Sequence, residues 1–323
     1  MRVVVTGGAG FIGRAIVKHL VDRGDEVVAL VRDPAKASHL PGERVTLVQS
    51  DLSDPAALCR SMAGADAAIH AAGSYRIGIK PSERDAMWDA NVGATERVLD
   101  AAIAAQLARI VYVSTANVFG DTHGQVVDET YRRDESEGFI SWYDETKFRA
   151  HQAAQERIAH GAPIVIVMPA QVYGPNDHSG ATEQIDGAYH GRLPYTVFPT
   201  MGLGWVHVDD LAEGILAALD RGSVGESYVL AGDPRTMADS VSVAARQGGH
   251  KPPRLTLPTL LLRLIAPLSD RVGGLPGLPP NLRETISAGG SVTYWASHAK
   301  AQRELGFEPR SLEQGVVDTW GGA

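Results

Sequence analysis

The chain has 323 residues, 44% hydrophobic and 21% charged, which is enough for one or two globular domains with a large core. Lys and Arg number 30 against 38 Asp and Glu, and the net charge of −8 argues against a nucleic-acid or membrane-surface binder. The single cysteine, Cys59, excludes an internal disulfide and a multi-cysteine metal site. We therefore expect a cytoplasmic protein without a metal centre.

Up to about residue 170, short apolar runs alternate with stretches of helical periodicity. The expected helices include residues 12–24, 83–106 and 142–157. Continuous apolar strands separated by helices indicate βαβ units and a parallel sheet that is covered on both faces. The sequence therefore predicts an α/β fold, a Rossmann-type doubly wound parallel sheet, with strands at 2–6, 26–31, 45–49, 66–70, 110–114 and 163–168.

The second part of the chain has a different texture, with frequent Gly and Pro and few expected strands. We predict that residues 1–170 form the dinucleotide-binding domain and that 171–204 and 233–323 form a smaller, mostly helical substrate region. A strand, a helix and a further strand at 205–232 are expected to return to the first domain. The apolar run at 257–268 is shorter than the roughly 20 residues that span a membrane, so we expect a buried or pocket-covering helix.

The segment TGGAGFIG (6–13) lies between the first expected strand and the first expected helix. Its glycines, Gly7, Gly10 and Gly13, let a backbone approach closely, and a helix N-terminus offers free N–H groups to a pyrophosphate. Because the segment opens a βαβ unit, it predicts dinucleotide binding rather than a plain turn.

The end of the second expected strand bears on the choice of dinucleotide. NAD-binding proteins usually place an acidic residue there for the ribose 2′-hydroxyl, but this strand ends at Val31 and continues with Arg32. An arginine suits a 2′-phosphate, and Lys36 is near enough to assist. We therefore favour NADP(H) over NAD(H), although Asp33 would reverse the assignment if it faced the ribose.

Tyr143 and Lys147 lie four residues apart in an expected helix, and therefore one turn apart on one face. Such a pair also occurs by chance, as an aromatic ring stacked on an aliphatic stem. Here a preceding strand ends in Ser114 and Thr115 at the edge where open α/β folds bind ligands. A phenol that donates a proton, an ammonium that lowers the phenol's pKa and a hydroxyl that holds a substrate oxygen would suit hydride chemistry on a carbonyl.

Together these motifs resemble the extended short-chain dehydrogenases/reductases, also called the NAD-dependent epimerase/dehydratase family. The resemblance runs over nearly the whole chain and is specific, because it joins TGGAGFIG to a series of further segments. These are SDL (50–52), HAAG (70–73), NVGAT (91–95), STANVFG (114–120), YDETK (143–147), MPAQVYGP (168–175) and WVHVDDLA (205–212).

The resemblance implies a role for each matching residue. Tyr143 would be the general acid/base, Lys147 would bind the nicotinamide ribose, and Thr115 would supply the catalytic hydroxyl in place of its neighbour Ser114. The implied cofactor contacts, beyond the three glycines, Arg32 and Lys36, are Phe11, Ile12, Asp51, Leu52, Ala71, Ala72, Gly73, Asn91, Tyr143, Lys147, Pro169 and Val172. Substrate candidates are Ser74, Tyr75, Thr115, Gln171, His178, Tyr189 and Met201.

Two departures from the family pattern point to a branch within it. Met168 stands where many members have arginine, and Val31 where the sugar-nucleotide branch has an acidic residue. Both resemble the dihydroflavonol-reductase and hydroxysteroid-dehydrogenase-like branch, which implies an NADP(H)-dependent oxidoreductase acting on a small or medium apolar ketone, aldehyde or alcohol.

Two other functions stay open. An NAD-dependent nucleotide-sugar 4-epimerase or dehydratase would need a basic site for a diphosphate, which Arg192 and Arg254 could supply. A non-catalytic dinucleotide sensor would need no general acid. We also expect a possible homodimer, because alanine-rich faces at 101–108 and 150–156 would allow close helix contacts, although packing within the chain would explain them equally well.

Overall fold

The computed structural model describes residues 1–37, 40, 42–271 and 279–322. Its largest unit is a seven-stranded sheet with the order β10-β6-β5-β4-β1-β2-β3, in which every neighbouring pair is parallel. The strands are β1 (Arg2–Thr6), β2 (Glu26–Val31), β3 (Val45–Gln49), β4 (Ala67–His70), β5 (Arg109–Val113), β6 (Ile164–Pro169) and β10 (Ser227–Leu230). The six strands expected before residue 170 are therefore all present, and the predicted Rossmann-type fold is confirmed.

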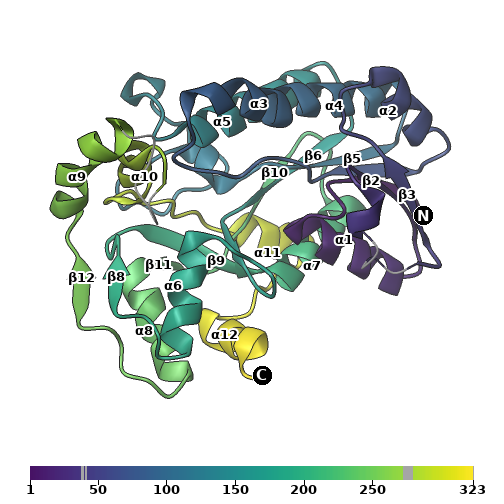
Figure 1. Cartoon of the computed structure of the whole chain (residues 1–323). Helices are drawn as coiled ribbons and strands as arrows, with labels where there is room; N and C mark the ends of the chain where they lie inside the picture. The colour runs from purple at the N-terminus through teal and green to yellow at the C-terminus, as the bar shows by residue number, and fades with distance from the viewer. Residues whose placement is uncertain (38–39, 41, 272–278, 323) are drawn as a thin grey trace.

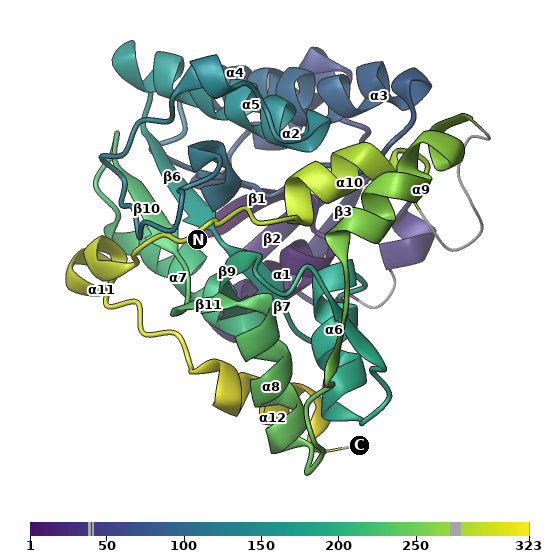
Figure 2. The ribbon, with the colours of Figure 1, turned by 90° about the vertical axis from the view of Figure 1, so that its left-hand side faces the viewer.

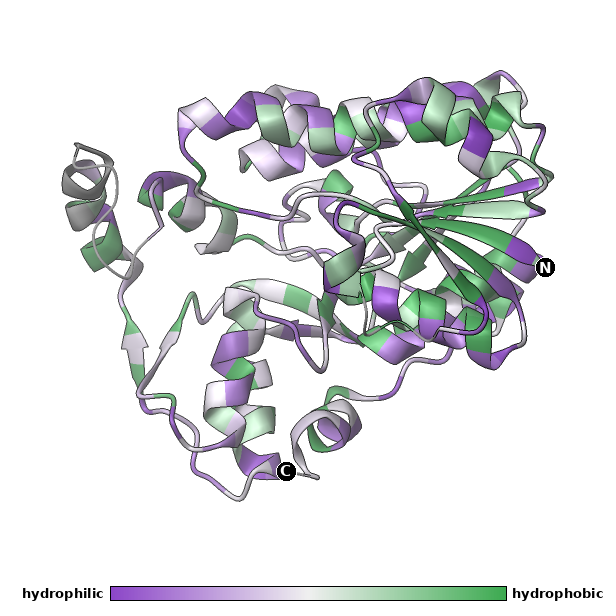
Figure 3. Cartoon of the chain, turned by 45° about the vertical axis from the view of Figure 1, so that its right-hand side comes forward, coloured by the Kyte–Doolittle hydropathy of each residue, from purple (hydrophilic) through white to green (hydrophobic). Residues whose placement is uncertain are grey.

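Helices cover both faces of this sheet because its strands are apolar on both sides. One face packs on α1 (Phe11–Asp22), α7 (Val208–Arg221) and α11 (Ala299–Leu305). The other face packs on α2 (Pro55–Met62), α4 (Ala94–Ala104) and α5 (Trp142–Ala159). Figure 1 shows the two helical layers above and below the strands, and Figure 3 shows how hydrophobic residues follow those strands.

The helix expected at 83–106 is built from three pieces. It begins with α3 (Arg84–Trp88), passes through a π-helical turn at Asp89–Gly93 and continues as α4. Single π turns inside helices are rare and often occur at functional sites. This turn carries Asn91, one of the residues expected near the cofactor.

The region beyond residue 170 contains more strand than the sequence indicated. A three-stranded sheet joins β7 (Gln171–Tyr173), β9 (Gly202–His207) and β11 (Pro234–Thr236), and a two-stranded sheet joins β8 (Tyr195–Val197) and β12 (Leu255–Leu257). The expected strand around residue 205 is β9, which pairs in this small sheet, whereas α7 and β10 join the large unit. Sequence reasoning missed β7, β8, β11 and β12 because each has only three residues.

The helices of this region form two groups. α6 (Gly180–Tyr189), α8 (Met237–Gln247) and α12 (Leu312–Trp320) pack together around Trp205, while α9 (Thr259–Arg271) packs on α10 (Leu282–Gly289). Figure 2 shows α9 and α10 side by side. The apolar run at 257–268 thus forms α9, which buries Leu262 and Ala266 and leaves Leu260, Leu261 and Leu264 exposed.

Within residues 1–37, 40, 42–271 and 279–322, no helix has the length and apolar character that crossing a bilayer requires. The same part of the chain holds no group of three or more His, Cys, Asp or Glu side chains arranged to bind a metal ion.

Candidate active site

A cleft of about 1650 Å³ runs along the carboxyl edge of the large sheet, between that sheet and the second region. This is the edge at which open α/β folds bind ligands, because the loops that leave successive strands meet there. The volume exceeds the 300–1000 Å³ typical of a site for one drug-sized ligand. It leaves room for a dinucleotide and a second molecule.

The glycine-rich loop forms one end of this cleft, and at Gly7 and Gly13 the backbone leaves no room for a side chain. Gly7 has a φ of +72°, and a Cβ placed on it would lie 2.8 Å from the Ala72 Cα atom. A Cβ on Gly13 would overlap the carbonyl oxygen of Gly7. The loop therefore brings the start of α1 close against the chain that leaves β4, and all three glycines line the cleft.

The start of α1 is suited to an anion. Its N-cap residue, Gly10, has no side chain to accept the first free N–H groups, and no acidic residue occurs in the first turn. Those N–H groups and the positive end of the helix dipole favour a phosphate group in the cleft. The residues present thus fit the pyrophosphate of a dinucleotide, and Phe11 and Ile12 line the same wall.

The loop after β2 contains the three charged residues that bear on the binding of a 2′-phosphate. Arg32, Asp33 and Lys36 all line the cleft and are exposed. Asp33 accepts the backbone N–H of Ala35 at 3.1 Å and lies 3.8 Å from the Lys36 ammonium. No ion pair to the Arg32 guanidinium occurs among the described residues, so Arg32 is the group that remains available in this loop.

The expected adenine end lies after β3, where Asp51 and Leu52 both line the cleft. The Asp51 carboxylate accepts the backbone N–H and the hydroxyl of Ser53, which holds its pKa below the ordinary value. Leu52 has a φ of +66°, unusual for a side chain of its size, and its carbonyl accepts the Arg97 guanidinium at 2.7 Å. This bond fixes the turn that places Leu52 against the cleft.

Tyr143 and Lys147 occupy the first two turns of α5, and Thr115 follows the end of β5. Tyr143 and Thr115 line the cleft, whereas Lys147 lies beneath the surface and donates to the Val113 carbonyl at 3.2 Å. The Lys147 ammonium also lies 5.3 Å from the centre of the Tyr112 ring. The structure thus brings together three residues that are dispersed over 33 positions of the chain.

The neighbouring hydroxyls of Ser114 and Thr115 differ in their hydrogen-bond partners. The Ser114 hydroxyl bonds to Nδ1 of His151 at 3.0 Å, which points it toward α5. The Thr115 hydroxyl donates to the Asn117 side-chain oxygen at 3.2 Å or to the Pro169 carbonyl at 3.4 Å, and it accepts the Asn117 backbone N–H at 3.3 Å. All three distances are longer than the Ser114–His151 distance, and the assignment of Thr115 as the catalytic hydroxyl stays a prediction.

Burial shifts the pKa values of Tyr143 and Lys147. It raises the pKa of the Tyr143 phenol above its ordinary value, assisted by the neighbouring Tyr75, while interaction with the Thr115 hydroxyl acts in the opposite direction. The expectation that this pKa is lowered is not met, because burial outweighs the groups that lower it, and the Lys147 ammonium donates to the Val113 carbonyl. Burial also lowers the pKa of Lys147 to about 8.

Asn91 acts behind the cleft wall rather than in it. Its side chain accepts the Ser74 backbone N–H at 2.7 Å, and its amide donates to the Ser74 carbonyl and to the Thr146 hydroxyl. This side chain therefore ties the loop after β4 to α5. Asn91 holds Ser74 in the cleft wall without reaching the cleft itself.

His70 links the glycine-rich loop to the same π turn. Its Nδ1 lies 2.7 Å from the Thr6 hydroxyl and its Nε2 lies 3.0 Å from the Thr95 hydroxyl, which donates to the Asn91 carbonyl. Complete burial lowers the pKa of His70 to about 3, so the ring is neutral. Sequence reasoning placed this residue in a motif but did not assign it a role.

The remaining predicted residues divide between those that line the cleft and those that do not. Ala71, Ala72, Gly73, Pro169 and Val172 line it, as do the substrate candidates Ser74, Tyr75, Gln171 and Met201. His178 is exposed and does not line the cleft, although its neighbour Asp177 does. Tyr189 also lies outside the cleft, because its ring packs against Trp320 in the α6–α8–α12 group.

Sequence reasoning also missed residues of the cleft wall. Asn117 lies within the motif STANVFG, so its position near Thr115 was available from the sequence. Tyr294 lines the cleft from 151 positions beyond Tyr143, and its hydroxyl donates to the Ala288 carbonyl at 3.1 Å. Nothing in the local sequence around Tyr294 indicates this position.

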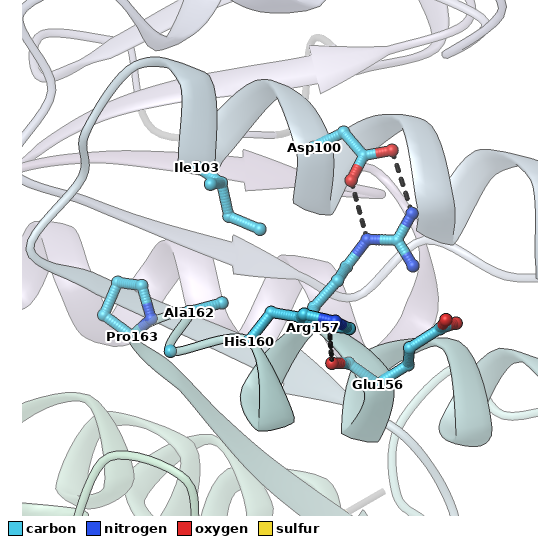
Figure 4. Close-up of a pocket in the computed structure, with 8 residues that line it drawn as sticks. Asp100, Ile103, Glu156, Arg157, His160, Ala162 and Pro163 are labelled. Atoms are coloured by element: carbon cyan, nitrogen blue, oxygen red, sulfur yellow. Dashed lines mark hydrogen bonds and ion pairs between the residues drawn. The ribbon is translucent and has the colours of Figure 1, made fainter.

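A second, smaller cavity of about 420 Å³ lies between α4 and α5 on the opposite side of the sheet from α1 (Figure 4). Arg157 and Asp100 form a double hydrogen bond across it, at 2.7 and 2.8 Å. The alanines that suggested helix-to-helix contact between subunits, such as Ala102, Ala150 and Ala154, are buried inside this chain. Packing within the chain thus accounts for them.

The fold and the cleft fit a dinucleotide-binding protein, with a tyrosine at the carboxyl edge of a Rossmann-type sheet and a lysine directly beneath it. The sequence model of the NAD-dependent epimerase/dehydratase family matches residues 3–231. The chain belongs to this family, the extended short-chain dehydrogenases/reductases, whose members are NAD(P)-dependent enzymes of the oxidoreductase and epimerase type.

Individual relatives agree with this assignment over nearly the whole chain. The sequence is 30% identical to a 4-hydroxy-2-methyl-3-oxo-4-farnesyl-3,4-dihydroquinoline-1-oxide ketoreductase of Stigmatella aurantiaca, with 98% of this chain and 95% of the relative covered. It is 28% identical to a 2-alkyl-3-oxoalkanoate reductase of Stenotrophomonas maltophilia (strain K279a), with 98% and 97% covered. Among solved structures, that of gox2253 has a TM-score of 0.82 at 32% identity and covers 99% of this chain and 96% of its own.

Proposed function

We propose that this protein is an NADP(H)-dependent reductase of a ketone or aldehyde with an apolar body, able to oxidise the corresponding alcohol. The observation that carries the proposal is the meeting of Thr115 and Tyr143 in one cleft with the glycine-rich loop, with Lys147 directly beneath. Two relatives named as reductases of carbonyl compounds support the reaction class.

The chemistry requires one hydride and one proton. Bound NADPH would supply the hydride to the carbonyl carbon. The Tyr143 phenol donates its proton to the carbonyl oxygen, the Thr115 hydroxyl hydrogen-bonds to that oxygen, and Lys147 provides positive charge below the phenol. A raised pKa keeps Tyr143 protonated at neutral pH, as a proton donor must be. General acid catalysis of this kind contributes about 10²–10⁴-fold in rate.

The preference for NADP(H) rests on the loop after β2. Arg32 is exposed at the cleft without an ion-pair partner among the described residues, and Asp33 is engaged by Ala35 and Lys36. A guanidinium can hold a phosphate by two hydrogen bonds, whereas a carboxylate would repel it. Both features support a 2′-phosphate at this end.

The charge of the cleft supports a neutral substrate. Among the described residues that line it, Arg32 and Lys36 are the cationic ones, and both lie at the end expected to hold the adenosine. The substrate end contains Asp177 and Glu183 together with apolar side chains such as Leu193, Phe198 and Met201.

This distribution disfavours the nucleotide-sugar alternative, which needs positive charge for a diphosphate. Arg192 pairs with Asp186 on α6 and does not line the cleft, and neither does Arg254. A non-catalytic sensor is disfavoured for a different reason, because sensing does not require a tyrosine and a lysine buried together at the nicotinamide end.

The decisive experiment compares NADPH with NADH by titration and then assays a panel of apolar ketones and aldehydes with the preferred cofactor. Tyr143→Phe is expected to lower kcat/KM by about 10²–10⁴-fold and to leave the Kd for NADPH within about twofold. Tyr131→Phe removes a hydroxyl outside the cleft and serves as the matched control. Full activity in Tyr143→Phe would exclude this mechanism, and turnover of nucleotide sugars alone would favour the epimerase.

The possible homodimer expected from the sequence stays a prediction, because the alanines of α4 and α5 that suggested it are buried within the chain. Light scattering of the purified protein gives the molecular mass directly. A mass equal to that of one chain would exclude the dimer.

A further inference from the structure

Helix α10 lies below α3 and α5 in the views of Figures 1 and 2 and contributes Thr285, Ala288 and Gly289 to the cleft wall. It belongs to the second region, and it starts 139 positions after Tyr143 in the chain. We propose that its residue Glu284 is a positioning residue for Tyr143, acting through the first turn of α5. This inference rests on the proposed function, because it assigns Tyr143 the role of proton donor.

The proposal rests on one hydrogen bond that joins α10 to the start of α5. The Glu284 carboxylate accepts the backbone N–H of Trp142 at 2.6 Å. Trp142 is the first residue of α5 and directly precedes Tyr143. The bond therefore fixes the backbone from which the phenol projects.

The first turn of α5 needs this acceptor. The first N–H groups of a helix have no partner within the helix, and the N-cap Ser141 serves Asp144 and Glu145 through its hydroxyl and its carbonyl. Glu284 serves the N–H of Trp142 from outside. A carboxylate is also the group that the positive end of a helix dipole favours.

Glu284 is itself held in place. Its second carboxylate oxygen accepts the Asn281 side-chain amide at 3.0 Å, and its backbone N–H donates to the Asn281 side-chain oxygen at 3.2 Å. This reciprocal pair is the N-terminal cap of α10. The carboxylate thus has one defined position.

The same end of α10 also supports the other side of Tyr143. The Asn281 backbone N–H donates to the Gly78 carbonyl at 2.9 Å. Gly78 lies in the loop between Tyr75, whose ring meets that of Tyr143 edge-on at 4.8 Å, and Ile79, which packs against Tyr143. The start of α10 therefore secures both the backbone before Tyr143 and the loop against which its ring rests.

Because the Glu284 carboxylate fixes the backbone that carries the phenol, its removal is expected to displace Tyr143. Small errors in the position of a reacting group can cost about 100-fold in rate. Removing the carboxylate should therefore lower kcat without weakening cofactor binding, because the glycine-rich loop lies at the other end of the cleft. An ordinary structural role would lower stability and leave kcat per folded molecule unchanged.

The test compares Glu284→Ala and Glu284→Gln with the wild-type chain. Glu313→Ala is the matched control, because Glu313 also lies in the first turn of a helix of the second region and does not line the cleft. The readouts are kcat and KM for the best carbonyl substrate, the Kd for NADPH, and hydrogen exchange of a peptide that covers residues 141–147.

We expect Glu284→Ala to lower kcat about tenfold or more, to leave the Kd for NADPH within about twofold and to accelerate exchange in residues 141–147. Glu284→Gln keeps an oxygen acceptor and should restore most of the rate, and Glu313→Ala should behave as wild type. Wild-type kcat in Glu284→Ala, or equal losses in the Ala and Gln variants, would overturn the inference. A wild-type chain that reduces no carbonyl would instead refute the proposed function.

Discussion

The two halves of the cleft come from regions built in different ways. The dinucleotide half lies at the edge of the parallel sheet, in which each strand is a single apolar run. The motif residues that line this half come directly after the strands. The substrate half is assembled from short strands and helices that meet only in the folded chain, such as β9 with β7 and β11. The dinucleotide half is therefore readable from the sequence, while the substrate half depends on long-range packing.

This difference predicts that substitutions in the two halves change different kinetic quantities. Substitutions in the dinucleotide half should act on cofactor binding or on the chemical step, with large effects. Substitutions in the substrate half should act mainly on the KM for the carbonyl compound, with small effects, because many side chains share that wall.

The largest effect on cofactor binding is expected from Gly13→Ala. The added methyl group would overlap the Gly7 carbonyl oxygen, so the turn between β1 and α1 must open. We expect the Kd for NADPH to rise by about 100-fold or more, equivalent to about 2.7 kcal/mol, measured by fluorescence titration. Gly42→Ala is the control, since a Cβ there meets no atom within 4 Å. Unchanged affinity would show that the loop does not cradle the dinucleotide.

A pH dependence is expected from Lys147. Burial lowers its pKa to about 8, so the ammonium is charged below that pH and is lost as the pH rises through it. We expect kcat/KM for reduction to fall over this range. Lys147→Arg keeps a charge to far higher pH, so whatever activity it retains should lack the decline near pH 8. A decline that persists in the arginine variant would assign it to another group.

Arg32→Ala tests the cofactor preference. Hydrogen bonds to charged groups contribute about 1.5–3 kcal/mol, so we expect the Kd for NADPH to rise about 10- to 100-fold. The Kd for NADH should change by less than about threefold, because NADH has no 2′-phosphate. Arg44→Ala, which removes an exposed guanidinium bonded to the Gly24 carbonyl, is the control. A variant that weakens both cofactors equally would contradict the proposed role.

The smallest effect is expected from Met201→Ala in the substrate half. Met201 is partly buried, lines the cleft and packs against both apolar clusters of the second region. We expect KM for an apolar ketone to rise about 3- to 10-fold, in line with the lost transfer free energy of a partly buried side chain, with the Kd for NADPH unchanged. Steady-state kinetics separate the two. A change confined to NADPH binding would show that the two halves are not distinct.

The sequence by itself determined the large sheet, the glycine-rich loop and the spacing of Tyr143 and Lys147 on one helix. An apolar strand, a tight turn and a helix are local patterns, so RVVVT, TGGAGFIG and the spacing of Tyr143 and Lys147 are visible in short windows. The same locality explains why most cofactor residues that were predicted from the motifs line the cleft.

Tertiary structure alone decided which residues close the cleft and how the start of α5 is held. Tyr294 reaches the cleft from a distant segment, Tyr189 turns away because Trp320 offers it an apolar partner, and Glu284 meets Trp142 across 142 positions. Such contacts join segments that are far apart in the chain, and their geometry depends on how the two regions pack. No local pattern of charge or hydrophobicity carries that information, because each of these side chains is ordinary in its own sequence window.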